Sequence, residues 1–176
     1  MDFDEAMLRA ADEFVAEEGL RNVRLVKDDL FASELEPHAF DLVHARFEIT
    51  PLGRASEQME TYVRLARPAG TIVLEDPDPG SWLFNPSAPA LERLIELTIE
   101  AFRASGGDWG AARHHLHLLR EFAIEGSVRA DVVALPPGHP YLGLPLQFAT
   151  ALESRLLEAV TADALDALRM NAESEL

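Results

Sequence analysis

The sequence predicts an α/β fold with a doubly wound, mostly parallel sheet. Segments with the apolar character of strands alternate with segments of helical periodicity through the first half of the chain. This alternation is typical of parallel sheets that are covered by helices on both faces. The chain has 176 residues, of which 48% are hydrophobic, and this is enough for one well-buried core. We therefore expect a single domain over residues 1–176.

Helical and extended segments alternate in the first half of the chain. In the segments 4–19 and 55–67, apolar residues recur every three or four positions, as they do on one face of a helix. The segments 22–29, 39–49 and 71–76 are predicted to be strands, because they are rich in Val, Leu, Ile and Phe. The segment 39–49, "AFDLVHARFEI", is nearly continuous in apolar character, which is typical of a strand buried on both faces.

The second half of the chain is predicted to be mainly helical. A helical stretch runs from about residue 87 to 123, between the Pro-rich loops "EDPDPGSW" and "ALPPGHPYLGLP". The segment 127–135 is a candidate for a further strand, and helices are predicted over about 145–159 and 162–174. The chain contains no internal repeat and no low-complexity segment.

The charge and composition argue against several classes of partner. The net charge is −16, whereas grooves for nucleic acid and anionic membrane surfaces require clustered Lys and Arg. The absence of cysteine excludes disulfides and thiolate–metal sites. No apolar run approaches the roughly 20 residues of a membrane span, and no signal-peptide pattern opens the sequence. We expect a cytoplasmic protein whose partner is a small molecule or another protein, with no contact to nucleic acid or membrane.

Polar side chains follow the predicted strands. They are Asp2, Asp28, Asp29, Arg46, Glu48, Glu75, Asp76 and Asp78. In doubly wound parallel sheets, ligands bind outside the carboxyl ends of the strands. If a strand also precedes the first helix, these residues gather at one rim of the sheet, where a ligand is expected.

Four motifs follow one another at the spacing of a known family. They are "DFDEAML", "NVRLVKDDL", "FDLVHARFEI" and "METYVRLARPAGTIVLED". In this order they resemble the class I S-adenosylmethionine-dependent methyltransferases, which have a Rossmann-like fold. The resemblance covers residues 1–80 and extends more loosely over 105–135, where "HLHLLREFAIEGSVRADV" is similar to a late helix and strand of that family.

The resemblance implies a cofactor, S-adenosylmethionine, and assigns roles to five residues. Asp2 matches the acidic residue that accepts hydrogen bonds from the ribose hydroxyls, and Met7 falls where an apolar side chain lies near the adenosine. Asp29 matches the acid that takes the adenine amino group, with Leu30 beside it. Arg46 lies where a strand opens onto the methionine end of the cofactor. The implied function is methyl transfer to a small organic acceptor.

The sequence also departs from the family pattern. No glycine-rich loop precedes Asp2, and "RPAG" replaces the commoner Pro-Gly-Gly turn. An N-terminally truncated fold without its central strand leaves a gap between the strands 22–27 and 40–47. Unpaired backbone groups there cost about 1–3 kcal/mol each when they are buried. We expect a homodimer, a partner chain or rearranged pairing to close this gap.

Two functional alternatives remain open beside an active methyltransferase with residues 81–123 as its acceptor lid. A methyltransferase-like subunit that no longer binds the cofactor would serve as an interaction module, and the missing glycine-rich loop favours this alternative. An oxidoreductase of the NAD-binding Rossmann type shares an acid at the end of its second strand, but the order of motifs after residue 22 argues against it. The acids of "EDPDPGSW" have three interpretations. The default is a structural turn, the second is contact with the acceptor, and the third is binding of a divalent cation.

Several single residues have both structural and functional interpretations. Asp2 and Glu5 fit a capping box at the start of the first helix. His114 and His117 have a spacing that can hold a metal, but no third ligand follows at a fixed offset, so no metal site is expected. His114 or His115 could lie in the acceptor pocket as a base or hydrogen-bond partner, or be solvated on an amphipathic helix.

Overall fold

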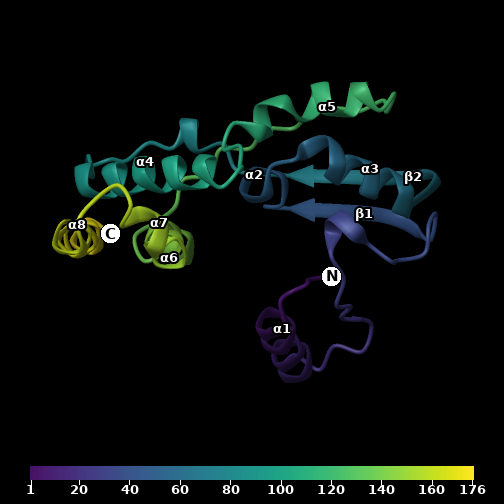
Figure 1. Ribbon diagram of the computed structural model, residues 1–176, viewed down its shortest axis with the longest axis horizontal. Coiled ribbons are helices and arrows are strands. Elements are labelled where there is room, and N and C mark those ends of the chain that lie inside the picture. The colour runs from purple at the N-terminus through teal and green to yellow at the C-terminus, as the bar shows by residue number, and fades with distance from the viewer. The chain divides into compact units, whose positions relative to one another are not determined.

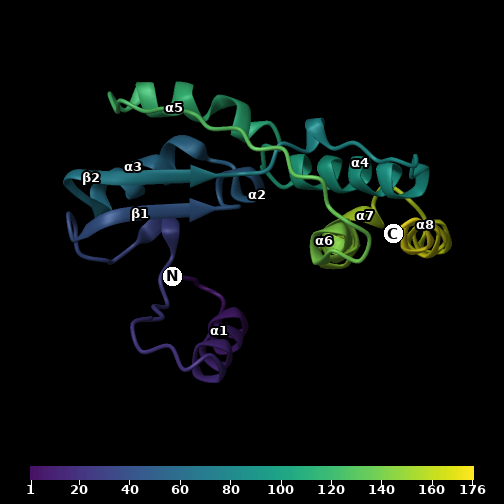
Figure 2. The same cartoon turned by 180° about the vertical axis from the view of Figure 1, so that it is seen from behind.

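The computed structural model describes all 176 residues, which form two compact units. Unit 1 comprises Met1–Arg46 and Arg54–Glu75, and unit 2 comprises Phe47–Gly53 and Asp76–Leu176. Strands occur only in unit 1, whereas unit 2 is helical (Figures 1 and 2). The chain is therefore an α/β protein, as the sequence predicts, and no helix in it is long and apolar enough to cross a membrane.

Unit 1 contains a small parallel sheet. Its elements are α1 (Glu5–Glu17), the 3-10 turn η1 (Leu30–Ala32), β1 (Phe40–Arg46), α3 (Ala55–Leu65) and β2 (Ala66–Glu75). The strands β1 and β2 are parallel, with Leu42 opposite Thr71 and Arg46 opposite Glu75. The helix α3 packs against both strands and η1, and it buries Met59 completely. The prediction of parallel strands flanking a helix over 55–67 is confirmed.

The sheet is smaller and more exposed than the sequence predicts. It has two strands rather than the full set of a doubly wound fold. In β1, Ala45 is buried while Phe40 and Leu42 are exposed, so the expectation of a strand covered on both faces is wrong. A strand becomes buried on both faces only when layers pack on each side of it, and the apolar run alone does not supply them.

Two predicted strands are absent. The segment 22–29 forms only an isolated parallel bridge between Asp2 and Lys27, in which the Asp2 N–H donates to the Val26 carbonyl at 3.1 Å and the Asp28 N–H donates to the Asp2 carbonyl at 3.0 Å. The segment 127–135 is irregular, and Val132 within it is 92% exposed. Both segments have the composition of strands but no extended neighbour that continues the ladder, and a strand is defined by its pairing.

The first helix begins at an aspartate other than the one expected. Asp4 is the N-cap of α1, and its carboxylate accepts hydrogen bonds from the N–H groups of Ala6 and Met7. Asp2 lies two residues before this N-cap, and its carboxylate accepts the N–H of Asp4 at 2.9 Å. The helix over 4–19 is confirmed, but the capping box formed by Asp2 and Glu5 is wrong.

Unit 2 is an assembly of helices around one core. Its elements are α2 (Ile49–Leu52), η2 (Pro79–Ser81), α4 (Pro89–Ala104), η3 (Ala111–His114), α5 (His115–Glu121), η4 (Pro140–Gly143), α6 (Leu144–Ala151), α7 (Glu153–Leu156) and α8 (Ala162–Ser174). The core is a continuous apolar cluster formed by Ala88, Leu91, Leu94, Ile95, Leu97, Ala101, Ala149, Leu156, Leu165 and Ala172. The helices predicted between 87 and 123 and in the last third of the chain are confirmed.

The start of α4 is capped from the far end of the chain. Its N-cap residue, Ala88, has no side chain that can accept a hydrogen bond. Instead the carboxylate of Glu175 accepts the N–H of Ala90 at 3.1 Å and the N–H of Leu91 at 2.9 Å. Two of the donors that a helix N-terminus leaves without partners are thereby satisfied, and the negative charge lies at the positive end of the helix dipole.

Candidate functional site

Two of the residues implied to hold a cofactor, Asp2 and Asp29, lie in unit 1, where Asp2 forms the isolated parallel bridge with Lys27 and Asp29 follows two residues after Lys27. One carboxylate oxygen of Asp2 accepts the N–H of Asp4 at 2.9 Å, and one carboxylate oxygen of Asp29 accepts the N–H of Phe31 at 2.9 Å. The second oxygen of each has no hydrogen-bond partner in the protein. Both carboxylates can therefore accept a hydroxyl or an amino group from a ligand.

A cation lies near Asp29. The guanidinium of Arg54 stacks on the Phe31 ring, with 3.8 Å between its central carbon and the ring centroid. Arg54 also forms an ion pair with Glu57, and this hydrogen bond is the main cause that raises the pKa of Arg54, to which the charge of Asp29 adds.

The other three residues implied to hold the cofactor, Met7, Leu30 and Arg46, do not share the surroundings of Asp2 and Asp29. Leu30 is buried, and its carbonyl accepts the hydroxyl of Thr61 at 2.9 Å. Met7 is exposed on α1, and the Arg46 Nε atom donates to Glu75 at 3.0 Å. The structure thus brings Asp2 close to the segment that carries Asp29 and Leu30, while Arg46 is engaged by a carboxylate at the end of the sheet.

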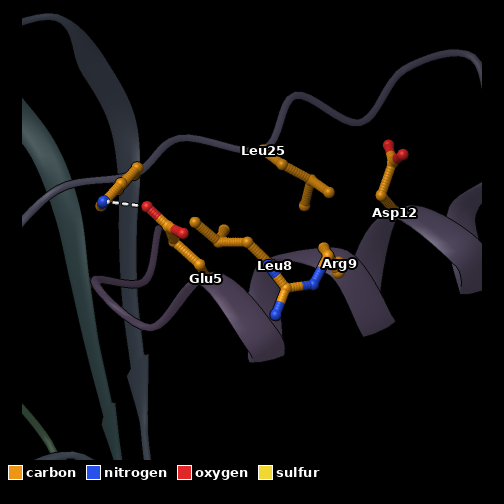
Figure 3. Close-up of a pocket in the computed structure, with 6 residues that line it drawn as sticks. Glu5, Leu8, Arg9, Asp12 and Leu25 are labelled. Carbon is orange, nitrogen blue, oxygen red and sulfur yellow. Dashed lines mark hydrogen bonds and ion pairs between the residues drawn. The ribbon is translucent and has the colours of Figure 1, made fainter.

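Unit 1 also contains a shallow pocket of about 350 Å³ between α1 and the segment before Asp28 (Figure 3). Its lining residues are Glu5, Leu8, Arg9, Asp12, Leu25 and Lys27. Lys27 donates a hydrogen bond to Glu5, and this bond lowers the pKa of the Glu5 carboxyl. Its volume is near the lower limit for small-molecule sites, and none of the five implied cofactor residues lines it.

The most buried ionisable pair lies in unit 2. The Nε2 atom of His115 is 3.0 Å from an oxygen of Asp76, and the side chains are 11% and 1% exposed. The other oxygen of Asp76 accepts the N–H of Thr50 at 3.1 Å. Asp76 directly follows β2, and His115 is the first residue of α5. Both carboxylate oxygens therefore have a donor, which is what a buried charge requires.

The loop after Asp76 and the turn before His115 are joined by a second ion pair. The Nε atom of Arg113 lies 3.0 and 3.1 Å from the two carboxylate oxygens of Asp78. A Cβ atom at Gly80 would lie 2.5 Å from a terminal nitrogen of Arg113, so a larger residue at position 80 would push the Arg113 side chain away. The paired charges fix the loop that carries Asp76 against the segment that carries His115.

Three buried polar side-chain atoms of unit 2 have no hydrogen-bond partner. They are the Thr50 hydroxyl, the indole nitrogen of Trp109 and the Nε atom of Arg169. The backbone joins the neighbourhoods of Thr50 and Trp109, because the Asp108 N–H donates to the Thr50 carbonyl at 2.9 Å. Unsatisfied buried groups are rare in native proteins, and a bound water or ligand is a common explanation for them.

Trp109 is also the centre of an aromatic cluster. Its ring centroid lies 6.3 Å from Trp82, 5.0 Å from Phe102 and 5.7 Å from Phe148. Next to these rings is a cavity of about 10 Å³, lined by Trp82, Ile95, Thr98, Ile99, Trp109, Pro145 and Phe148. The polar pair and the aromatic cluster are thus both parts of unit 2.

Sequence reasoning identified part of this cluster. Asp76 was expected at the rim because it follows a strand, and His115 was one of two candidate acceptor residues. The structure separates the histidines, because His114 and His117 are exposed whereas His115 is buried. Thr50 was missed, since its role depends on a backbone N–H and carries no side-chain signal. No group of three or more side chains could hold a metal ion.

No protein-family model matches the sequence, and no curated protein matches it.

Proposed function

We propose that the chain is an S-adenosylmethionine-dependent methyltransferase with a Rossmann-like fold that acts on a small organic acceptor. One observation carries the proposal: Asp2 forms a parallel bridge with Lys27, two residues before Asp29, and Asp2 and Asp29 each have a carboxylate oxygen without a hydrogen-bond partner. Asp2 accepts the ribose hydroxyls and Asp29 accepts the adenine amino group. Met7 and Leu30 contribute apolar contacts, and Arg46 lies towards the methionine end.

When bound, the cofactor supplies a methyl group on a positively charged sulfur. The main task of the protein is then to hold the acceptor in line with that group, because orientation supplies much of the rate in such reactions. Residues 81–123 belong to unit 2 and include α4 and α5. In this proposal they recognise the acceptor. The protein is proposed to act in the cytoplasm.

A second candidate is a non-catalytic module that binds a partner chain. The observation in its favour is the incomplete layer structure of unit 1, where the sheet has two strands and α1 has no buried residue. A homodimer or another chain that pairs with the open edge of β1 would extend the sheet and cover exposed apolar side chains such as Leu42.

Calorimetric titration with S-adenosylmethionine tests the first proposal. We expect the wild-type chain to bind it, and we expect Asp2→Asn and Asp29→Asn each to weaken binding about tenfold or more, since a hydrogen bond to a charged group contributes about 1.5–3 kcal/mol. Asparagine retains an oxygen for the local N–H groups, so the turns are preserved. Asp41→Asn is the matched control, because Asp41 is an exposed strand residue paired with Arg67.

The same titration separates the alternatives. A folded, oligomeric chain that does not bind S-adenosylmethionine would favour the non-catalytic module. A clear heat of binding with NAD in place of S-adenosylmethionine would overturn the methyltransferase in favour of an oxidoreductase.

A further inference from the structure

The pocket between α1 and the segment before Asp28 has the features of a separate ligand site in unit 1. We propose that it binds a free α-amino acid with an aliphatic side chain, whose carboxylate contacts Arg9 and whose ammonium group contacts Asp12. None of the residues implied to hold the cofactor lines this pocket. The inference therefore goes beyond the proposed function and does not depend on it.

The pocket is formed by one face of α1 and by the extended segment opposite. The helix supplies Glu5, Leu8, Arg9 and Asp12, which are spaced at i, i+3, i+4 and i+7 and therefore lie on one side of the helix. Leu25 and Lys27, two positions apart, line the pocket from the other segment. Both elements belong to Met1–Arg46, so the whole pocket lies within unit 1.

The middle of the pocket is apolar. Leu8 and Leu25 lie between Glu5 at one end and Asp12 at the other (Figure 3). Both leucines are half-buried, and α1 has no fully buried residue. Proteins normally fill the space between packed elements, whereas here a volume of about 350 Å³ adjoins the two leucines. An aliphatic group in this volume would remove their apolar surface from water, which is favourable.

The charged lining residues have both signs, and one pair of them is already satisfied. Lys27 donates a hydrogen bond to Glu5, so these two charges neutralise each other. The side chains of Arg9 and Asp12 form no hydrogen bond or ion pair in the protein. Arg9 stays free although Glu5 and Glu13 each lie four positions away, at the spacing of helical ion pairs. One cation and one anion thus remain available in a pocket without net charge.

This charge pattern selects a dipolar ligand. A ligand with a single charge is attracted by one of the two free groups and repelled by the other, whereas an α-amino acid carries both charges on one head group. A guanidinium binds a carboxylate through two parallel hydrogen bonds, and an ammonium group donates to a carboxylate. Arg9 and Asp12 are neighbours at i, i+3, so both can contact one head group. The side chain of the ligand then lies against Leu8 and Leu25.

The size of the pocket and the packing of α1 favour the same kind of ligand. A volume of about 350 Å³ is near the lower limit for small-molecule sites, which suits a molecule as small as an amino acid. A ligand that contacts both α1 and the segment opposite also stabilises the arrangement in which the two are together. We therefore expect binding to protect the amide groups of α1 from hydrogen exchange.

Titration of the whole chain with L-leucine, followed by the NMR shifts of its backbone amides, tests the proposal. We expect saturable shifts in α1 and in residues 20–27, with a dissociation constant below about 1 mM, and slower amide exchange in α1. Three related probes each lack one feature of leucine: isoamylamine has no carboxylate, isocaproate has no ammonium group, and glycine has no side chain. Each should bind about tenfold more weakly or less, because one set of contacts is lost.

Two charge variants and a matched control locate the head group. Arg9→Gln should weaken leucine binding about tenfold but leave isoamylamine binding unchanged, since that probe has no carboxylate to lose a partner. Asp12→Asn should weaken leucine binding to a similar extent but leave isocaproate binding unchanged. Glu13→Gln changes an exposed carboxylate of the same helix that does not line the pocket, and it should leave the dissociation constant of leucine unchanged.

Three results would overturn the proposal. Isoamylamine binding as tightly as leucine would make the pocket a site for simple cations, and isocaproate binding as tightly would make it a site for simple anions. The absence of saturable shifts with leucine would mean that the pocket holds only water. The amide spectrum of each variant shows directly whether α1 is intact, so a loss of binding is distinguished from a loss of the helix. Since the titration needs no cofactor, its outcome is separate from that of the titration with S-adenosylmethionine.

Discussion

The two units of this protein make opposite use of amphipathic helices. In unit 2, α4 places Leu91, Leu94 and Leu97 in a continuous core shared with three other helices, α6, α7 and α8. In unit 1, α1 has a comparable apolar face, yet Met7 and Phe14 on it remain 56% and 57% exposed. An apolar stripe thus identifies the face that a helix can bury, but burial depends on whether another element is present to cover it.

The sheet of unit 1 shows the same dependence on neighbours. Its strands β1 and β2 pair with each other and pack against α3, whereas the extended residues near Lys27 form a single bridge. Most of the stability of a helix or strand in a protein comes from tertiary packing rather than from local preference. We therefore expect α1 and the segment that follows it to unfold at lower free energy than unit 2.

The largest effect should come from the core of unit 2. Leu94 is completely buried, and Leu94→Ala should lower the free energy of unfolding by about 2–5 kcal/mol, because the substitution removes buried methyl groups and leaves a cavity. Urea unfolding followed by tryptophan fluorescence measures this directly, since both tryptophans, Trp82 and Trp109, belong to unit 2. Met7→Ala, on the exposed face of α1, is the control and should change the transition by less than about 0.5 kcal/mol. A comparable loss in both variants would contradict the contrast between the units.

A smaller effect is expected at the start of α4. Glu175→Gln retains one oxygen for the N–H groups of Ala90 and Leu91 but removes the charge, and we expect a loss of about 1 kcal/mol in the same tryptophan-detected transition. Glu173→Gln, at a neighbouring exposed position of α8, should have no effect. If the two variants were equally stable, the carboxylate of Glu175 would not be the effective cap.

The elements that the sequence predicted correctly are those whose signal is local. The helices over 55–67, in the stretch 87–123 and over 162–174 are confirmed. Each has a long apolar periodicity that is bounded by residues that break helices. The predictions of strands over 22–29 and 127–135 were wrong. Apolar β-branched residues show that a segment can pair with a strand, but they do not show that a neighbouring strand is present.

The candidate site followed the same division between local and non-local information. Asp76 was found by the general rule that polar residues after parallel strands line binding sites. Thr50 and Glu175 were not, because Thr50 donates its own backbone N–H to a distant side chain and Glu175 accepts distant backbone N–H groups, and the sequence marks neither contact. His115 could be named beside His114, but only the packing of α5 shows which one is buried.

A substitution of Asp4, the N-cap of α1, tests the stability of unit 1, which is the more weakly packed of the two units. Asp4→Ala removes the acceptor for the N–H groups of Ala6 and Met7 and should destabilise α1 by about 1 kcal/mol. Because unit 2 has its own core, the tryptophan-detected transition should not move. Amide hydrogen exchange in α1 measures the local change, and Asp12→Ala in the middle of the same helix serves as the control. A shift of the tryptophan transition would mean that the two units unfold together.

The smallest predicted effect concerns the pH dependence of unit 1. Partial burial raises the pKa of Asp28, but hydrogen bonds from the Ser33 hydroxyl and the Glu34 N–H outweigh it, so that the pKa lies below its ordinary value. A carboxyl whose pKa is lower in the folded than in the unfolded state stabilises the fold above the unfolded value, about 3.9 for aspartate. That contribution is lost as the pH falls through the lower folded value.

Asp28→Asn should therefore flatten the acid-induced loss of structure in unit 1 while leaving the neutral-pH fold intact, because asparagine can still accept the N–H of Glu34. An NMR titration of the Asp28 carboxyl carbon measures the pKa itself, and a midpoint at or above the ordinary value would contradict the prediction. Since Asp28 adjoins the bridge between Asp2 and Lys27, acid should loosen this bridge before it affects the core around Leu94. The order of these two events, observed in one pH series, would show that local hydrogen bonds hold unit 1 together where unit 2 relies on packing.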